Sequence, residues 1–217
     1  MYPIWQKIAI NYLDQRPFRL NSHNINIWKI ALNEDFPQAN SLINQQEAEL
    51  ATKFYAVKHQ QQFIKVRAFT RLILAKYLHI HPLQCQFRHN KYGKPKVTNH
   101  PLLEFNLSHS GHIALLAITN RHPIGIDLEQ FPSRLIPQIV SSLPNQLESQ
   151  PKYLQKLSFI NLWTQKEASV KAQGLSLSTN RSCHGYHILT FTPQIGYKGA
   201  ICYPQQYFSF DYYQLIP

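Results

Sequence analysis

Three carboxylates and one lysine stand at spacings that suit a divalent metal bound to a phosphate. Asp127 and Glu129 are two residues apart in an apolar run, residues 122–129, that is typical of a β-strand, so their side chains share one face. Glu167 and Lys171 are four apart in a segment of helical character and also share a face. Mg²⁺ takes oxygen ligands and keeps substrate phosphates in its shell, so the two segments together could hold a metal-bound pyrophosphate. Taken singly, the patterns are also typical of a solvated strand end and a surface ion pair.

Strands are expected in both halves of the chain, because β-prone and alternating apolar residues recur between turn signals. The early strand covers residues 25–32, and the Tyr-Gly-Lys-Pro sequence at residues 92–95 predicts a turn. The other expected strands cover residues 85–88, 113–119, 122–129, 186–191, 199–203 and 207–213.

Two long helical regions alternate with these strands. The first begins at a capping box formed by Asn44 and Glu47 and ends near residue 81, as one bent helix or as two. The second covers about residues 151–173, and Trp163 is expected to be buried on it. Each half therefore combines strands with a long helix, which predicts an α+β fold of two similar lobes, although no internal sequence repeat is visible.

Composition narrows the class of protein. The 217 residues are enough for one large domain or two small ones, and 44% hydrophobic with 12% aromatic residues predicts a folded chain. The longest apolar run, residues 113–118, is far shorter than the ~20 residues of a membrane span, and the N-terminal residues lack a signal-peptide pattern. The cysteines are odd in number and widely spaced, at Cys85, Cys183 and Cys202. We therefore expect a cytoplasmic protein without disulfides, a zinc site or a membrane segment.

The charge balance favours anionic partners. Lys and Arg number 22 against 11 Asp and Glu, for a formal net charge of +11, and the basic residues are dispersed along the chain. A nucleic-acid-binding module would explain this charge and the 12 Tyr and 12 Phe residues. Such a module would not explain why Asp127, Glu129 and Glu167 stand near a surface that should bind an anion. We therefore expect no nucleic-acid partner.

Four short blocks form one ordered pattern between residues 91 and 171. They are Lys91-Tyr92-Gly93-Lys94-Pro95, Phe105-Asn106-Leu107-Ser108-His109-Ser110-Gly111, Gly125-Ile126-Asp127-Leu128-Glu129 and Trp163-Thr164-Gln165-Lys166-Glu167-Ala168-Ser169-Val170-Lys171. In this order they resemble the signature of the 4′-phosphopantetheinyl transferases of the surfactin-synthetase-activating type, and weaker similarity covers most of the chain.

The resemblance implies a pseudo-dimer of two similar lobes. Each lobe would pack a small, mainly antiparallel sheet against a long helix, with the active site in the cleft between them. Residues 1–121 would form the lobe on the nucleotide side of coenzyme A, and residues 122–217 the lobe with the metal-binding acids and the catalytic helix. A monomer is expected.

The resemblance also implies the reaction. The phosphopantetheine arm of coenzyme A, the substrate, would pass to a serine of an apo acyl or peptidyl carrier protein, with release of adenosine 3′,5′-bisphosphate. Asp127, Glu129 and Glu167 would bind Mg²⁺, or Mn²⁺ in its place, and Lys171 would stabilise the leaving diphosphate. Either Glu167 or Glu129 could be the general base. Carrier proteins are usually acidic, which suits a chain of charge +11.

The resemblance assigns three further residues to coenzyme A. Ser108 and His109 would bind its nucleotide end, His109 at the 3′-phosphate, and Lys94 would lie near the adenine. Without the resemblance, Ser108 and His109 would be interpreted as a capped turn and Lys94 as a surface lysine in a turn. A hydrolase is disfavoured because no Gly-x-Ser-x-Gly sequence surrounds Ser108.

Two departures from the family pattern affect substrate binding. Gln62 stands where many relatives have an arginine near the 3′-phosphate, so Lys53, Lys58 or Arg67 is expected to compensate. Residues 133–150 are rich in proline where relatives often have a helix that contacts the carrier. A relative that binds carriers without modifying them is therefore an alternative, against which the intact acids and Lys171 argue.

Overall fold

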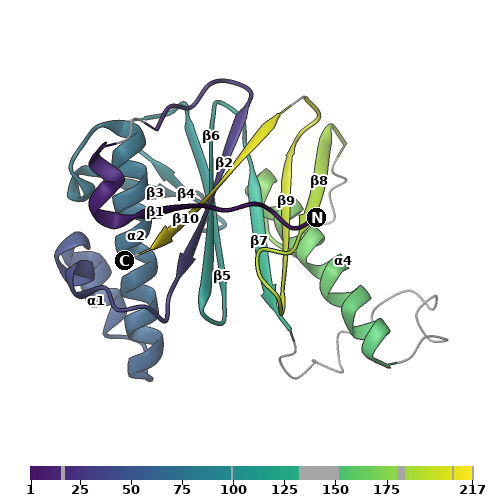
Figure 1. The fold of residues 1–217 in the computed structure, drawn as a ribbon, viewed down its shortest axis with the longest axis horizontal. Coiled ribbons are helices and arrows are strands. Elements are labelled where there is room, and N and C mark those ends of the chain that lie inside the picture. Colours follow the sequence, from purple (N-terminus) through teal and green to yellow (C-terminus); the bar gives the residue numbers. More distant parts are fainter. Residues whose placement is uncertain (16–17, 99, 132–151, 180–183, 207, 217) are drawn as a thin grey trace.

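Two β-sheets lie face to face between two long helices (Figure 1). The computed structural model describes residues 1–15, 18–98, 100–131, 152–179, 184–206 and 208–216. From one side to the other, the layers are α2, a five-stranded sheet, a three-stranded sheet and α4 (Figure 1). This arrangement confirms the predicted mixture of helices and sheets.

The five-stranded sheet joins strands from both ends of the chain. Its order is β1-β10-β2-β6-β5, and its strands cover Gln6–Ala9 (β1), Ser209–Ile216 (β10), Asn24–Ala31 (β2), Ile113–Asn120 (β6) and Leu103–Ser110 (β5). The last strand, β10, pairs in parallel with both β1 and β2, whereas β2, β6 and β5 are antiparallel. The predicted strand near residues 207–213 therefore lies beside the first strands of the chain.

The smaller sheets are antiparallel. In the three-stranded sheet the order is β7-β9-β8, covering Gly125–Gln130 (β7), Tyr197–Pro204 (β9) and Tyr186–Phe191 (β8). Phe87–His89 (β3) and Pro95–Val97 (β4) form a hairpin, whose turn uses the positive φ of Gly93. The strand predicted at residues 85–88 is shifted, because Cys85 ends the short 3₁₀ helix η3, Pro82–Gln84.

The first helical region is two helices, α1 (Gln45–Ala51) and α2 (Val57–Leu78). The predicted capping box is confirmed: Asn44 accepts from the backbone N–H of Glu47, and the Glu47 side chain accepts from the backbone of Asn44. The same Glu47 carboxylate accepts from Nε of Arg71, 2.7 Å away and fully buried on α2. This paired charge holds α1 against α2.

In the part of the chain that the structure describes, the remaining helical elements are α4 and two 3₁₀ helices. α4 covers Lys152–Gln173, which confirms the predicted second helix. The 3₁₀ helices are η1 (Ile10–Gln15) and η2 (Pro37–Leu42).

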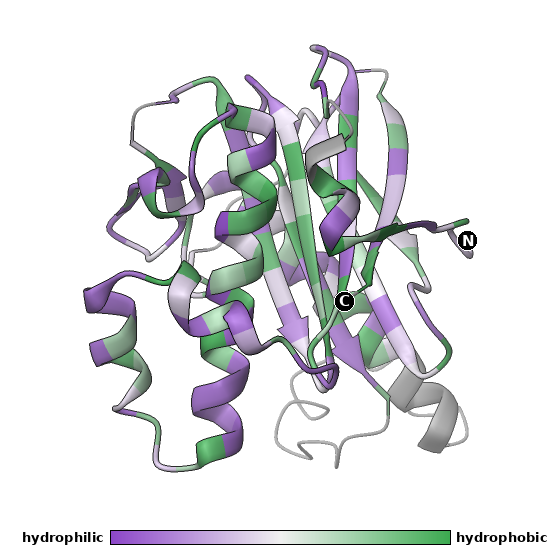
Figure 2. Ribbon diagram, turned by 60° about the vertical axis from the view of Figure 1, so that its left-hand side comes forward, coloured by the Kyte–Doolittle hydropathy of each residue, from purple (hydrophilic) through white to green (hydrophobic). Residues whose placement is uncertain are grey.

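Apolar side chains fill the spaces between the layers. One core joins α2 to one face of the five-stranded sheet, around Trp28, Phe69 and Phe105. A second core lies between the two sheets, and small residues such as Ala168 and Ala200 let α4 pack closely on β9. Figure 2 shows hydrophobic residues concentrated in the central strands, whereas the first turns of α2 are largely hydrophilic. In the described part of the chain, no helix combines the length and apolar character needed to cross a membrane.

Candidate active site

Three elements bring one residue each to the centre of the site. The Lys171 ammonium on α4 lies 2.6 Å from Oδ1 of Asp127 on β7 and 3.2 Å from Oγ of Ser108 on β5. Ser108 also donates to Asp127 Oδ1 at 2.9 Å. Asp127 is buried, with 4% of its side chain exposed, whereas 29% of the Lys171 side chain is exposed. A buried carboxylate thus meets a cation that is accessible from outside.

The sequence of β7 explains why α4 can approach so closely. Gly125, Asp127 and Glu129 alternate along β7, so they share the face that α4 covers. A Cβ atom at Gly125 would overlap the backbone of α4 at Ala168 and Ala172. Only glycine fits at this point of contact. The glycine of the Gly-Ile-Asp sequence thereby sets the distance between the acids and α4.

Strands β5 and β7 belong to different sheets and are joined by hydrogen bonds from β5 side chains rather than by backbone pairing. Asn106 Oδ1 accepts from the backbone N–H of Ile126 at 2.8 Å, and Ser110 Oγ accepts from the N–H of Gln130 at 3.1 Å. Ser110 also donates to Glu129 Oε2 at 3.4 Å. These contacts fix β7, and with it the two acids, against the edge of the five-stranded sheet. Residues 103–110 form a strand, so the interpretation of Ser108 and His109 as a capped turn is wrong.

The residues predicted to be catalytic (Glu129, Glu167 and Lys171) or to bind the metal (with Asp127) lie on facing surfaces of β7 and α4. Glu167 Oε2 lies 3.7 Å from Lys171 Nζ, and Glu129 is two residues beyond Asp127 on the same strand face. Among the described residues, however, no group of three or more His, Cys, Asp and Glu side chains is close enough to hold a metal ion. Lys171 supplies the counter-charge for Asp127 in this arrangement.

The donor set nevertheless suits a hard cation. Asp127 Oδ2 is buried and, within the described part of the chain, has no hydrogen-bond partner. An unpaired buried carboxylate oxygen is costly unless a ligand or water satisfies it. All the nearby acidic ligand atoms are oxygens, which are the ligands that Mg²⁺ and Mn²⁺ prefer. The residue types present therefore suit a magnesium-type ion, for which Asp127 offers an unpaired buried oxygen and Glu129 and Glu167 are neighbouring acids.

Burial raises the pKa of both glutamates. For Glu129 the neighbouring charge of Asp127 raises the pKa further, while Lys171 opposes the shift. For Glu167 burial is again the main cause of the raised pKa, and Lys171 opposes it. A carboxylate with a raised pKa is a better proton acceptor at neutral pH than an ordinary one. The shifts do not distinguish the two candidate bases.

His109 faces the opposite side of β5 from Ser108. It lines a pocket of about 460 Å³ between β5 and the first turns of α2, together with Lys58, His59 and Gln62. Gln62 closes one side by donating from Nε2 to the carbonyl of Gly111 at 3.0 Å. Burial, followed by the charge of Lys171, lowers the pKa of His109. The pocket thus offers one lysine and two imidazoles to an anion.

The other residues assigned to coenzyme A lie outside this pocket. Lys94 Nζ donates to the carbonyls of Ile124, at 2.9 Å, and Ala172, at 3.1 Å, and so ties β4 to the start of β7 and to α4. Burial lowers its pKa to about 8. Lys53 is exposed between α1 and α2, and the Arg67 guanidinium lies over the Phe63 ring at 5.2 Å. Of the three candidates to compensate for Gln62, only Lys58 lines the pocket with His109.

Sequence reasoning missed three residues that build the site. His59 follows Lys58 in the pocket, and Asn106 and Ser110 hold β7 in place. The alternation of Asn106, Ser108 and Ser110 was a usable signal of a strand with one polar face. Trp163 is half-buried and stacks on Phe159, so the expectation of a buried side chain is wrong. Residues 133–150, expected to contact the carrier, lie outside the described residues.

Two family models together match most of the chain. Residues 27–121 match the model described as 4′-phosphopantetheinyl transferase, N-terminal, and residues 123–211 match the 4′-phosphopantetheinyl transferase superfamily. Both models contain residues of the site, since Ser108 lies in the first and Asp127 and Lys171 in the second.

Individual relatives carry the same description. The 4′-phosphopantetheinyl transferase HetI of Nostoc sp. (strain PCC 7120) is 34% identical over 168 residues, which are 71% of this chain and 70% of HetI. The 4′-phosphopantetheinyl transferase gsp of Aneurinibacillus migulanus is 32% identical over 139 residues, 62% of this chain and 57% of the relative. Sfp of Bacillus subtilis (strain 168) is 23% identical over 212 residues, 81% of this chain and 91% of Sfp.

Fold, site and similarity thus define a transferase with a mixed α and β architecture. The chain belongs to the 4′-phosphopantetheinyl transferase superfamily and is of the type represented by Sfp.

Proposed function

We propose that this chain transfers the 4′-phosphopantetheine arm of coenzyme A to a serine hydroxyl of an apo acyl or peptidyl carrier protein. The observation that carries the proposal is the contact of Lys171 with Asp127, beside a buried carboxylate oxygen that has no partner among the described residues. A cation and acids that bind metal ions are the groups needed to hold a diphosphate and stabilise its charge. The established family relationship supports the same reaction.

Three acids would hold the metal ion. Asp127, Glu129 and Glu167 present carboxylate oxygens from facing surfaces of β7 and α4. A bound Mg²⁺, or Mn²⁺, supplies Lewis-acid stabilisation of the diphosphate oxygens. Lys171 would then turn its ammonium from Asp127 to the diphosphate, for which its partly exposed side chain is suited.

The reaction exchanges one phosphorus–oxygen bond for another. The serine oxygen of the carrier forms a bond to the phosphorus that bears the pantetheine arm, and the bond from this phosphorus to the bridging oxygen breaks. Adenosine 3′,5′-bisphosphate leaves with that oxygen, whose negative charge Lys171 stabilises. The serine proton passes to Glu167 or Glu129, either of which has the raised pKa suited to a general base.

The pocket of His109 would receive the 3′-phosphate of the nucleotide. Lys58 and His59 lie in the same pocket. They would bind the phosphate in place of the arginine that many relatives have at the position of Gln62. We retain Ser108 as a further ligand of the nucleotide end, although its hydroxyl already contacts Asp127 and Lys171. For Lys94, whose amino group is bound by two carbonyls, contact with the adenine would come from its methylene groups. Direct contacts of Lys53 and Arg67 with coenzyme A stay predictions.

We propose a lobe boundary at residues 121–122, with the active site where the lobes meet. The separate family models for residues 27–121 and 123–211 support this division, as does the position of Asp127 and Lys171 opposite β5. Strand β10 would return from the second lobe to the sheet of the first. A monomer in the cytoplasm would then contain the complete site.

Mass spectrometry of the carrier tests the function. The protein is incubated with coenzyme A, Mg²⁺ and a panel of apo acyl and peptidyl carrier proteins. We expect one phosphopantetheine to be added to at least one carrier, and the addition to stop when EDTA removes the metal. Complex formation without a change of mass would indicate a protein that only binds carriers. Binding of nucleic acid, with neither a complex with a carrier nor a change in its mass, would indicate a nucleic-acid-binding protein.

A further inference from the structure

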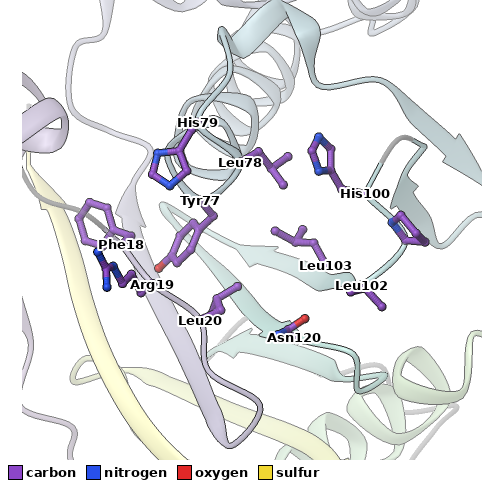
Figure 3. A pocket seen from close by; sticks show the side chains of 11 residues that line it. Phe18, Arg19, Leu20, Tyr77, Leu78, His79, His100, Leu102, Leu103 and Asn120 are labelled. Atoms are coloured by element: carbon purple, nitrogen blue, oxygen red, sulfur yellow. The ribbon is translucent and has the colours of Figure 1, made fainter.

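A second pocket lies at the far end of α2 from His109. It has a volume of about 510 Å³ and is formed by the C-terminal end of α2, the segment before β2, the segment before β5 and the end of β6 (Figure 3). This volume is within the range of pockets that bind small organic ligands. None of its lining residues belongs to the proposed transferase site.

The floor of this pocket contains the hydroxyl of Tyr77. The Tyr77 oxygen lies 2.8 Å from both Asn26 Nδ2 and Trp28 Nε1, and Asn26 Oδ1 is buried without a partner among the described residues. Exchange of the amide oxygen and nitrogen of Asn26 lets Tyr77 donate to this oxygen, so the three side chains satisfy one another. Tyr77 is 9% exposed, and in Figure 3 its hydroxyl points to the side of the pocket that holds Arg19 and Leu20. Tyr77 therefore forms a fixed floor beside Arg19.

The rim of the pocket is basic and its walls are largely apolar. Arg19, His79 and His100 surround the opening, and Figure 3 shows their side chains on different sides of it. None of the described residues that line the pocket is acidic, and Arg19 has no acidic partner in the described part of the chain. Leu78, Leu102 and other apolar side chains complete the walls. The lining therefore complements an anionic group on an apolar body.

We propose that this pocket is a binding site for a small amphiphilic carboxylate. The carboxylate would accept from the Arg19 guanidinium at the rim, and the apolar body would lie along Leu102 and its neighbours. Such a site shares no lining residue with the pocket proposed for the 3′-phosphate of coenzyme A, and it does not depend on the proposed transferase reaction.

Three probes of equal chain length test the charge preference. Octanoate, octan-1-ol and octylammonium are titrated against the whole protein, and binding is followed by ligand-observed NMR, first without and then with saturating coenzyme A. Octanoate should bind saturably and more tightly than the other two. Arg19→Gln should weaken octanoate by roughly tenfold, the loss of one charge-assisted hydrogen bond. Equal binding of octanol, displacement by coenzyme A or absence of octanoate binding would each overturn the proposal.

A matched pair of exposed leucines tests the location. Leu102 lines the pocket and is 51% exposed, whereas Leu83 is 44% exposed and lies outside it. Leu102→Glu places a like charge beside the bound carboxylate and should abolish octanoate binding, while Leu83→Glu should leave it unchanged. Both variants should retain wild-type transfer activity and melting temperature. Equal octanoate affinity in the two variants would show that the ligand binds elsewhere and would overturn the proposal.

Discussion

Lys171 and Asp127 form the ion pair at the centre of the site, with Nζ 2.6 Å from Oδ1, while Oδ2 of the same carboxylate is buried without a partner among the described residues. One oxygen of Asp127 is thus satisfied by a side chain that can turn away, and the other is available to a metal ion. The pair connects β7 to α4, so a change at either residue affects both the charge balance of the site and the packing of these elements.

Lys171→Ala should separate these two effects. Without metal, loss of the ammonium leaves Asp127 buried and unpaired, so the melting temperature in EDTA should fall. Saturating Mg²⁺ should restore most of the stability, because the metal supplies the missing counter-charge, but turnover should stay more than ~10-fold below wild type. Lys171→Arg should rescue turnover only in part, since the guanidinium lacks the compact charge of the ammonium. Full turnover of Lys171→Ala at saturating coenzyme A and Mg²⁺ would make Lys171 an ordinary helix-surface residue.

Asn106 should act as a positioning residue for Asp127. Asn106→Leu removes the acceptor of the Ile126 N–H, and an unpaired buried N–H costs about 1–3 kcal/mol of stability. Because Ile126 precedes Asp127, the Mg²⁺ concentration for half-maximal transfer should also rise. Asn106→Asp keeps an oxygen acceptor and is expected to recover part of the lost stability. If Asn106→Leu has the wild-type free energy of unfolding and the wild-type Mg²⁺ concentration for half-maximal transfer, the contact of Asn106 with Ile126 has no positioning role.

Lys94 should give the protein a distinctive alkaline pH dependence. Burial lowers its pKa to about 8 from the usual 10.5, so between these values the unfolded chain holds more protons at this site than the folded chain. Stability attributable to Lys94 should therefore rise as the pH increases from 8 to 10.5. The test compares the free energies of unfolding of wild type and Lys94→Met across this window. As the pH rises, the free energy of unfolding of the wild type should increase relative to that of Lys94→Met. Parallel pH profiles of the two free energies would show that the pKa of Lys94 is not lowered.

His109 should discriminate between coenzyme A and its 3′-dephospho form. His109→Ala is expected to weaken coenzyme A by about 1.5–3 kcal/mol, the range for a hydrogen bond to a charged group. The affinity for the dephospho form should fall much less, because this ligand lacks the phosphate that His109 is proposed to contact. Calorimetric titration of both ligands measures the difference. Equal losses would assign His109 to another part of the nucleotide or to the fold.

The spacing of residues was sufficient to predict the facing acids. The two-residue spacing of Asp127 and Glu129 and the four-residue spacing of Glu167 and Lys171 are set by the periods of strand and helix, which local sequence determines. The capping box at Asn44 and the extent of α4 were predictable for the same reason.

Contacts between distant segments were not predictable in this way. The lysine of the Tyr-Gly-Lys-Pro turn, Lys94, could be foreseen as a turn residue, but its bonds to carbonyls at Ile124 and Ala172 depend on how β4 meets β7 and α4. The pairing of β10 with β1 and β2 likewise joins residues about 200 positions apart in sequence. The packing role of Gly125 became visible only once α4 was in place.

The most direct test of the account is the mass of an apo carrier protein after incubation with coenzyme A and the Asp127→Ala variant at low and high Mg²⁺. We expect folded Asp127→Ala to lose more than ~100-fold in transfer rate, because the metal-bound transition state loses its buried ligand. The matched control is Asp211→Ala, which changes an exposed aspartate on β10 and should modify the carrier at the wild-type rate. Near-normal addition of phosphopantetheine by folded Asp127→Ala at low Mg²⁺ would contradict the account.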